Sequence, residues 1–254
     1  MTFDHLASAV RTDVGRSRTN NEDAVAALNA EGVFAVADGM GGEGDGEIAS
    51  ARVCEAVRRA VTPAAGDAGG GPLPLELACR RIEQALDDAS HDLCEHARAR
   101  TLTVCGSTVV ALVFDCALPW QAVCLYAGDS PAYRCRDGRI DLLTRDHTFA
   151  SAVGAVQESL LPPRLRGLLT RAVGIHPTVL LDRVTIDVRN GDRFVLCTDG
   201  LPTAVPPSRI VRLMRRSPHP GEVADALVAE ALAAGAPDNV TVCVVDVGPL
   251  PRAG

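Results

Sequence analysis

Residues 32–50 read GVFAVADGMGGEGDGEIAS and mark the point where the predicted structure changes from strand to helix. The run from Gly32 to Ala37 is short, apolar and rich in β-branched and aromatic residues, which predicts a buried strand. Helical periodicity begins at Glu47 and continues to Ala60. The glycine-rich, acidic segment between them is therefore predicted to be a loop that leads from a strand into a helix. Such loops carry function more often than structure.

The rest of the chain repeats the strand signal more often than the helix signal. Further strands are predicted over Thr108 to Phe114, Ala122 to Ala127, Ala132 to Arg136, Arg139 to Leu143, Val179 to Val188, Asp192 to Thr198 and Val240 to Val245. Asp137-Gly138 predicts a hairpin turn, and hence antiparallel pairing. Amphipathic helices are predicted over Leu75 to Arg98 and Glu222 to Ala234. This pattern predicts an α+β fold in which helices cover the sheets.

Length and composition narrow the class of protein. The 254 residues contain no long polar linker, so residues 1–254 are predicted to form a single domain, with Thr62 to Pro74 as a flexible connection inside it. No run of about 18 apolar residues could span a membrane, and the first ten residues lack a secretory signal, so we expect a cytoplasmic protein. A net charge of −7 argues against a nucleic-acid surface. Nine scattered cysteines without a C-x-x-C pair are expected to be buried and reduced.

The acidic segment from residue 37 to residue 46 has three interpretations. Gly39, Gly41 and Gly44 match the G-x-G-x-x-G pattern of dinucleotide sites, but this pattern is weak by itself, and the acids beside it would repel a pyrophosphate. A cation site is favoured, because an acid such as Asp38 at a strand end, followed by glycine, offers a carboxylate and a backbone carbonyl. A solvated acidic turn is the third interpretation.

Three more aspartates lie at the ends of predicted strands. Asp199 precedes Gly200 after one strand, Asp238 stands just before another, and Asp129 follows a third. Each alone is more typical of a turn than of a metal ligand. Together with Asp38, however, they could meet around a pair of ions. Oxygen ligands without a His or Cys cluster favour Mg²⁺ or Mn²⁺ over zinc.

The N-terminal segment RSRTNNEDA, residues 16–24, mixes arginine with acids. By itself it predicts a solvated loop with salt bridges. Next to a metal site, an arginine could clamp a phosphate while the acids orient metal-bound water. His147 is expected to have a structural role rather than to act as an acid.

Nine short motifs follow one another along nearly the whole chain. They are G-x-x-R-x-x-N-E-D from Gly15, VADGMGG from Val36, GE-x-AS from Gly46, GST from Gly106, AGDS from Ala127, LTRDHT from Leu143, LTRAVG from Leu169, TDGL from Thr198 and PDN from Pro237. In this order and spacing, the chain resembles the metal-dependent serine/threonine phosphatases of the protein phosphatase 2C family, in its bacterial type. Any one motif is common, but the ordered series is specific.

The resemblance implies a four-layer α-β-β-α sandwich with two central antiparallel sheets flanked by helices, and two Mn²⁺ or Mg²⁺ ions at one end. The residues that it assigns are Asp38 as the bridge between the ions, the Gly39 carbonyl on the first ion, Asp199 and Asp238 on the second, Glu22 through water, Arg18 on the substrate phosphate, and Asp129 on a weaker third ion.

The activity implied by the resemblance is hydrolysis of phosphoserine and phosphothreonine in proteins, by a hydroxide that the two ions activate. Its partners would be phosphorylated proteins and an opposing bacterial Ser/Thr kinase. Met40 stands where many eukaryotic relatives carry a histidine proposed as general acid. Pro131 and Thr203 replace an arginine and an acid, which weakens the case for the third ion. The alternatives are a phosphatase-like module that binds phosphorylated partners without cleaving them, and a nucleotide-binding oxidoreductase.

Overall fold

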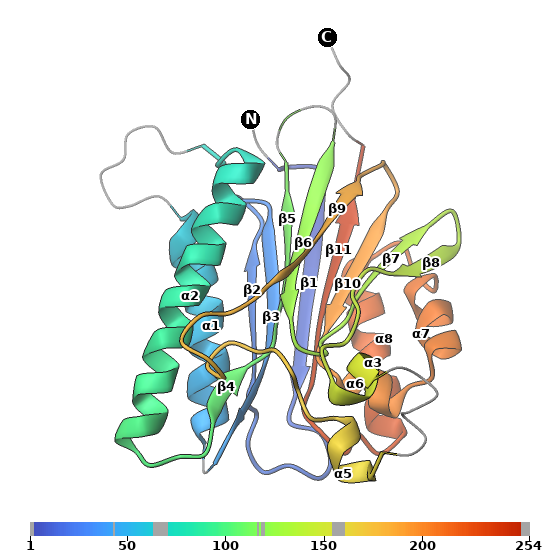
Figure 1. The fold of residues 1–254 in the computed structure, drawn as a ribbon. Helices are drawn as coiled ribbons and strands as arrows, with labels where there is room; N and C mark the ends of the chain where they lie inside the picture. The colour runs from blue at the N-terminus through green and yellow to red at the C-terminus, as the bar shows by residue number, and fades with distance from the viewer. Residues whose placement is uncertain are drawn as a thin grey trace.

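The computed structural model describes residues 3–42, 44–62, 71–115, 117, 120–153 and 161–249. Two antiparallel sheets stand face to face in the middle of the molecule (Figure 1). The first has the order β1 (Leu6–Asp13), β11 (Val240–Val247), β10 (Arg193–Cys197), β7 (Ala132–Arg136) and β8 (Arg139–Leu142). The second has the order β2 (Asp23–Leu28), β3 (Val33–Gly41), β5 (Val109–Phe114), β6 (Gln121–Ala127) and β9 (Asp182–Asp187), with β4 (Cys105–Ser107) paired to β3.

Helices cover the two outer faces of this pair of sheets. The long helices α1 (Asp45–Val61) and α2 (Leu75–Ala99) pack on the second sheet, and α6 (Gly200–Ala204), α7 (Pro207–Met214) and α8 (Pro220–Ala233) pack on the first. Two short helices are α3 (Phe149–Val153) and α5 (Pro163–Arg166). The predicted α-β-β-α sandwich is therefore confirmed. None of the helices in the described part of the chain is long and apolar enough to cross a membrane.

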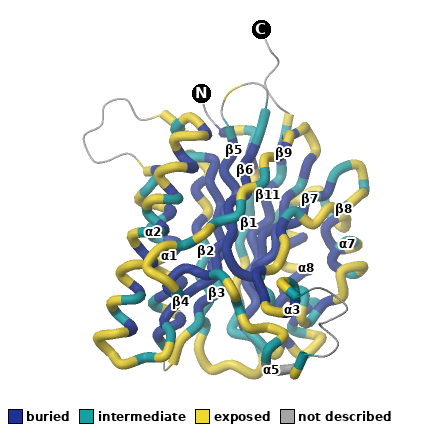
Figure 2. The backbone as a smooth tube through the Cα atoms, viewed as in Figure 1, coloured by how far each residue is buried: buried dark blue, intermediate teal, exposed yellow. Residues whose placement is uncertain are grey.

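Three apolar layers hold the four layers of secondary structure together. One lies between α1, α2 and the second sheet, one between the two sheets, and one between the first sheet and the C-terminal helices. Figure 2 shows the buried strands in the middle and the exposed outer surfaces of the helices. Between the sheets, the ring of Phe114 packs edge to face on Phe34, at 6.0 Å, and on Phe194, at 5.6 Å. These contacts join the two sheets directly.

Strand β3 shows why the run before Asp38 is apolar on both faces. Phe34 and Val36 point into the layer between the sheets, whereas Val33, Ala35 and Ala37 point toward α1 and α2. Because side chains alternate along a strand, a strand covered on both faces needs apolar residues at every position. The continuous apolar sequence ends at Asp38, where the protein interior gives way to a polar site.

The structure corrects the prediction of a loop from residue 37 to residue 46. Strand β3 continues through Asp38 to Gly41, because Gly39 to Gly41 pair with β4, and α1 already begins at Asp45. Asp38 is therefore inside a strand rather than at its end. Glycine lowers strand propensity, but backbone pairing with β4 overrides that preference here.

Strands β1 and β2 and helices α6 and α7 were not predicted from sequence. Strand β1 is mostly half-buried or exposed, so its sequence lacks the alternation that marks a strand. The eight described cysteines are free, and seven of them are buried, as expected. Cys116 and Glu43 lie outside the described residues, as does most of the predicted connection from Thr62 to Pro74.

Candidate functional site

Acidic side chains from both sheets gather where strands of the two sheets meet. Asp38 lies in β3 and Asp129 follows β6 in the second sheet, whereas Asp199 follows β10 and Asp238 precedes β11 in the first. Burial raises the pKa of Asp38 well above its usual value, and the charges of Asp23, Asp199, Asp129 and Asp238 raise it further. The structure thus brings together the four aspartates that the sequence singled out.

The backbone of Asp38 is held in place by Thr108. The Asp38 N–H donates to Thr108 Oγ1 at 2.9 Å, and the Thr108 N–H donates back to the Asp38 carbonyl at 2.9 Å. The Thr108 hydroxyl also shares a hydrogen bond of 2.7 Å with Ser130, next to Asp129. This buried network therefore fixes the positions of two of the acids relative to each other.

Asp23 belongs to the same group, although the sequence analysis placed it only among the acids that could orient metal-bound water and named it as no ligand. It lies opposite Asp38 in the pairing of β2 with β3, and its Oδ2 accepts a hydrogen bond of 2.9 Å from Thr198 Oγ1. Its Oδ1 is buried, and no described residue donates to it. Burial raises the pKa of Asp23 to about 6, despite the threonine hydrogen bonds that lower it. The strand register that places it beside Asp38 is not visible in the sequence.

Asp146 is the second acid that sequence reasoning missed. Burial raises the pKa of Asp129 to about 7, and the charges of Asp199 and Asp146 add to this effect. Burial also raises the pKa values of Asp146 and Asp199. The LTRDHT motif contains both Asp146 and His147, and an acid in a short polar segment gives no local signal of its burial. We call the six residues the acidic cluster: Asp23, Asp38, Asp129, Asp146, Asp199 and Asp238.

Arg18 and Glu22 reach the acidic cluster from the N-terminal segment. The Arg18 guanidinium donates to Asp238 Oδ2 at 2.8 Å, and 54% of the Arg18 side chain remains exposed. Burial raises the pKa of Glu22, and the charge of Arg18 opposes this shift. A half-exposed guanidinium at the edge of a set of mostly half-buried carboxylates is well placed to meet an incoming anion.

Asn239 ties this N-terminal segment to the loop that carries Asp238. Its Nδ2 donates to the carbonyls of Val14 and Asn20, both at 2.9 Å, and its Oδ1 accepts from the Glu22 N–H at 2.8 Å. Gly15 has a φ of 78°, and a Cβ there would lie 2.1 Å from the Asp238 carbonyl oxygen. Only glycine fits this close approach.

Gly39 packs against two neighbouring backbone segments. Its N–H donates to the Glu22 carbonyl at 3.0 Å, and a Cβ at this position would lie 2.0 Å from the Gly46 carbonyl oxygen. A side chain is therefore excluded at position 39. This packing keeps the N-terminal segment, β3 and α1 in direct contact beside Asp38.

His147 supports the loop that carries Asp129. Its Nδ1 accepts from the Gly128 N–H at 3.2 Å, so we assign the hydrogen to Nε2, which lies 3.2 Å from Asp182 Oδ2. The ring stacks on Tyr126 at 5.1 Å. Both ring nitrogens are thus engaged within the protein, which fits the structural role expected for this buried histidine.

The chemistry of the acidic cluster suits hard divalent cations. All six side chains are carboxylates, which Mg²⁺ and Mn²⁺ prefer, and none is a histidine or cysteine. Loss of water around the carboxylates raises the pKa of several of them, and repulsion between their negative charges raises it further. Bound cations would relieve this repulsion and would engage the unpaired Oδ1 of Asp23.

Comparisons with known proteins agree with this geometry. The family model described as protein phosphatase 2C matches residues 14–234. The serine/threonine protein phosphatase PstP of Mycobacterium tuberculosis is 34% identical over an alignment of 253 positions, and the match covers 95% of this chain and 45% of that protein. The chain therefore spans about half the length of that curated relative.

Two solved structures have the same fold and about one third of the residues in common. PppA, a key regulatory component of T6SS in Pseudomonas aeruginosa, is 34% identical with a TM-score of 0.82, over 96% of this chain and 98% of that one. The catalytic domain of PstP in complex with two manganese ions is 33% identical with a TM-score of 0.80. The match covers 96% of this chain and 99% of that chain. The chain therefore belongs to the protein phosphatase 2C family.

Proposed function

We propose that this chain hydrolyses phosphoserine and phosphothreonine in proteins and depends on two Mn²⁺ or Mg²⁺ ions. The observation that carries the proposal is the gathering of six carboxylates from both sheets, five of them half-buried and Asp146 exposed, beside the half-exposed Arg18. Membership of the family supports the reaction, and the PstP catalytic domain with two manganese ions supports the metals.

The ions would be held by oxygen atoms from remote parts of the chain. The proposed ligands are Asp38, the Gly39 carbonyl, Asp199, Asp238 and, for a weaker third ion, Asp129, with Glu22 acting through water. When bound, the ions neutralise charge on the phosphoryl group and activate a water molecule as the nucleophile. Asp23 and Asp146 add negative charge around these ligands.

The chain itself supplies positioning and charge. Arg18 would leave Asp238 and bind the equatorial oxygens of the phosphate, where negative charge develops in the transition state. Asn239 would hold the Arg18 segment against the Asp238 loop, so that the guanidinium stays beside the acids. Met40 has no titratable group and cannot protonate the leaving alkoxide.

The proposed substrates are proteins phosphorylated by a Ser/Thr kinase. PstP is named a serine/threonine protein phosphatase, and PppA is described as a key regulatory component of T6SS. We propose a similar regulatory setting for this chain, in which it opposes a bacterial kinase. Phosphoproteomic comparison of cells with and without the active enzyme would identify these substrates.

The test measures phosphate release from a phosphothreonine peptide. Protein stripped with a chelator should be inactive and should recover with Mn²⁺. Asp38→Asn and Asp199→Asn should each reduce kcat by at least about 1,000-fold, whereas Asp92→Asn, on the exposed face of α2, should have no effect.

A second pair of variants tests Arg18. Arg18→Ala should raise KM for the peptide and lower kcat, and Arg18→Lys should restore only part of both, because lysine cannot bind phosphate in a bidentate manner. Turnover that persists without metal, or that survives the loss of both Asp38 and Asp199, would overturn the proposal.

A further inference from the structure

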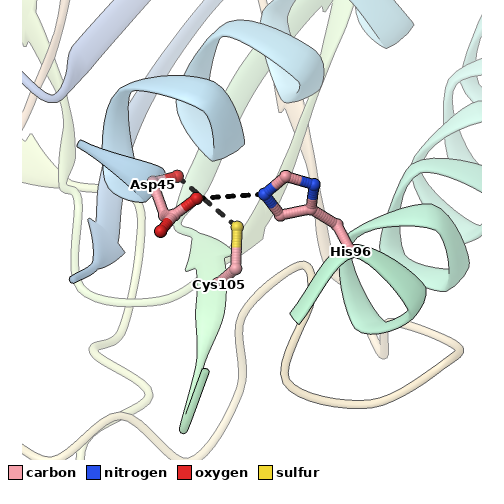
Figure 3. A group of neighbouring side chains, drawn as sticks. All are labelled: Asp45, His96 and Cys105. Atoms are coloured by element: carbon pink, nitrogen blue, oxygen red, sulfur yellow. Dashed lines mark hydrogen bonds and ion pairs between the residues drawn. The ribbon is translucent and has the colours of Figure 1, made fainter. Parts of the chain in front are cut away.

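Asp45, His96 and Cys105 come from three different elements and point toward one another (Figure 3). Asp45 is the first residue of α1, His96 lies in the last turn of α2, and Cys105 begins β4. One ligand atom from each lies within 4.8 Å of the other two. Asp45 and Cys105 are fully buried, whereas 20% of the His96 side chain is exposed, which leaves a path from solvent. We call these residues the Asp-His-Cys group.

The carboxylate of Asp45 is only half satisfied by its protein neighbours. Its Oδ1 lies 3.0 Å from His96 Nε2 and accepts from Arg100 Nη1 at 2.9 Å. Its Oδ2 is buried, and none of the residues that the structure describes donates to it. Leaving such an oxygen without a partner is costly, which points to a missing ligand.

The thiol of Cys105 is held against the same residue. Its Sγ donates to the Asp45 carbonyl oxygen at 3.4 Å, so the sulfur lies beside the Asp45 backbone while the imidazole approaches the carboxylate. A thiol, an imidazole and a carboxylate therefore face one small volume. The acidic cluster, in contrast, contains carboxylates alone.

We propose that the Asp-His-Cys group binds a zinc-class divalent ion, with water at the fourth position. Zinc takes cysteine, histidine and carboxylate ligands in tetrahedral geometry, and an open site has three protein ligands. Ligand atoms 2.0–2.3 Å from such an ion lie about 3.3–3.8 Å apart. A group within 4.8 Å can thus close on an ion with side-chain shifts of about 1 Å.

The charges of the group fit this ligand. The carboxylate of Asp45 and a thiolate at Cys105 would balance the two positive charges of the ion. Binding would displace the Cys105 proton, move the His96 hydrogen from Nε2 to Nδ1, and give Asp45 Oδ2 a partner. Arg100 would keep or release its contact without strain, because 49% of its side chain is exposed.

The site lies close to the acidic cluster but is separate from it. Gly46 follows Asp45, and a Cβ at Gly46 would lie 2.7 Å from the Glu22 carboxylate, while the Gly46 carbonyl packs on Gly39. An ion on the Asp-His-Cys group would thus fix the first turn of α1 where it meets the residues proposed for catalysis. Zinc binding is nevertheless independent of whether the chain cleaves phosphate.

The test uses Co²⁺ as a spectroscopic substitute for zinc, with Mn²⁺ in excess to fill the acidic cluster. Only a cysteine ligand produces thiolate-to-cobalt charge-transfer absorption in the near ultraviolet, so oxygen sites are silent. The wild type should show this band with one equivalent of Co²⁺. Cys105→Ser should abolish it, and His96→Ala should weaken Co²⁺ binding by at least about 100-fold. Cys94→Ser, at the half-buried cysteine on the same helix as His96, should retain it.

A second measurement does not depend on the thiol. Zinc at 100 times its Kd should raise the Tm of the Mn²⁺-loaded wild type by about 5–10 °C. Asp45→Asn, which keeps the shape but removes the charge, should lose this increase, and circular dichroism checks that each variant is folded. The proposal is overturned if the folded wild type shows neither band nor shift, if Cys105→Ser retains the band, or if Cys94→Ser alone removes it.

Discussion

Replacing Asp129 with asparagine should stabilise the metal-free protein at neutral and alkaline pH. Burial and the charges of Asp199 and Asp146 raise the pKa of Asp129 from 3.8 to about 7. The folded state therefore binds the proton more tightly than the unfolded state does. The stabilising effect of this bound proton is complete below about pH 4 and is lost as the pH rises to about 7. Above that range the charged carboxylate destabilises the folded state.

The size of the effect follows from the shift in pKa. One pKa unit corresponds to about 1.4 kcal/mol, so the shift at Asp129 costs about 4 kcal/mol at pH 8, but only about 2 kcal/mol at pH 5. Asp129→Asn keeps the shape and removes the charge. We expect the Tm of this variant to be about 8–16 °C higher than that of the wild type at pH 8. At pH 5 the difference in Tm should be smaller.

The measurement is thermal unfolding in a chelator at several pH values between 5 and 8. Asp92→Asn, on the exposed face of α2, is the matched control, because it removes one negative charge from an exposed helix position outside the acidic cluster. Its Tm should follow the wild type at every pH. Saturating Mn²⁺ should shrink the advantage of Asp129→Asn, since bound cations offset the repulsion.

Two results would refute this reasoning. The first is an Asp129→Asn variant no more stable than the wild type at pH 8 in chelator. The second is a gain in stability that does not diminish between pH 8 and pH 5, which would mean that the gain does not come from ionisation of Asp129.

Other predictions concern the residues that hold the site and the sheets. Asn239→Ala should lower the free energy of unfolding by about 2–4 kcal/mol, since three hydrogen bonds are lost, and should also reduce Mn²⁺-dependent activity; unchanged stability in urea would contradict this. Arg136→Leu should cost about 3–5 kcal/mol, because buried Asp192 loses two hydrogen bonds of 2.6 Å; adding Asp192→Asn should recover part of the loss. Phe194→Ala should cost about 3–5 kcal/mol through the cavity between the sheets, whereas Phe149→Ala on the surface should cost less than about 1 kcal/mol.

Local sequence was sufficient to predict a strand or a helix where apolar residues recur with a regular period. The apolar run before Asp38 predicts a strand buried on both faces, and the amphipathic pattern from Leu75 predicts α2, because both depend on side-chain periodicity. The motifs around Asp199 and Asp238 also marked acids that the fold brings together. Short apolar runs ending in an acid are thus readable without a structure.

Other elements depend on partners that sequence does not show. Strand β1 is mostly half-buried or exposed, and the glycines after Asp38 become a strand only because β4 pairs with them. The role of Asp23 depends on the register of β2 against β3. Neither register nor pairing is encoded by the residues of one strand alone.

The sequence by itself determined the family, the layered α+β class and the acids that end or interrupt the apolar strands. Only the tertiary structure decided which of the acids lie together. It also decided that His96 and Cys105 converge on Asp45, from which they are 51 and 60 residues away along the chain. The physical reason is that apolar periodicity is a local property of the chain. The pKa of a carboxylate and the formation of a ligand set are instead set by neighbours that meet only when the sheets and helices have packed.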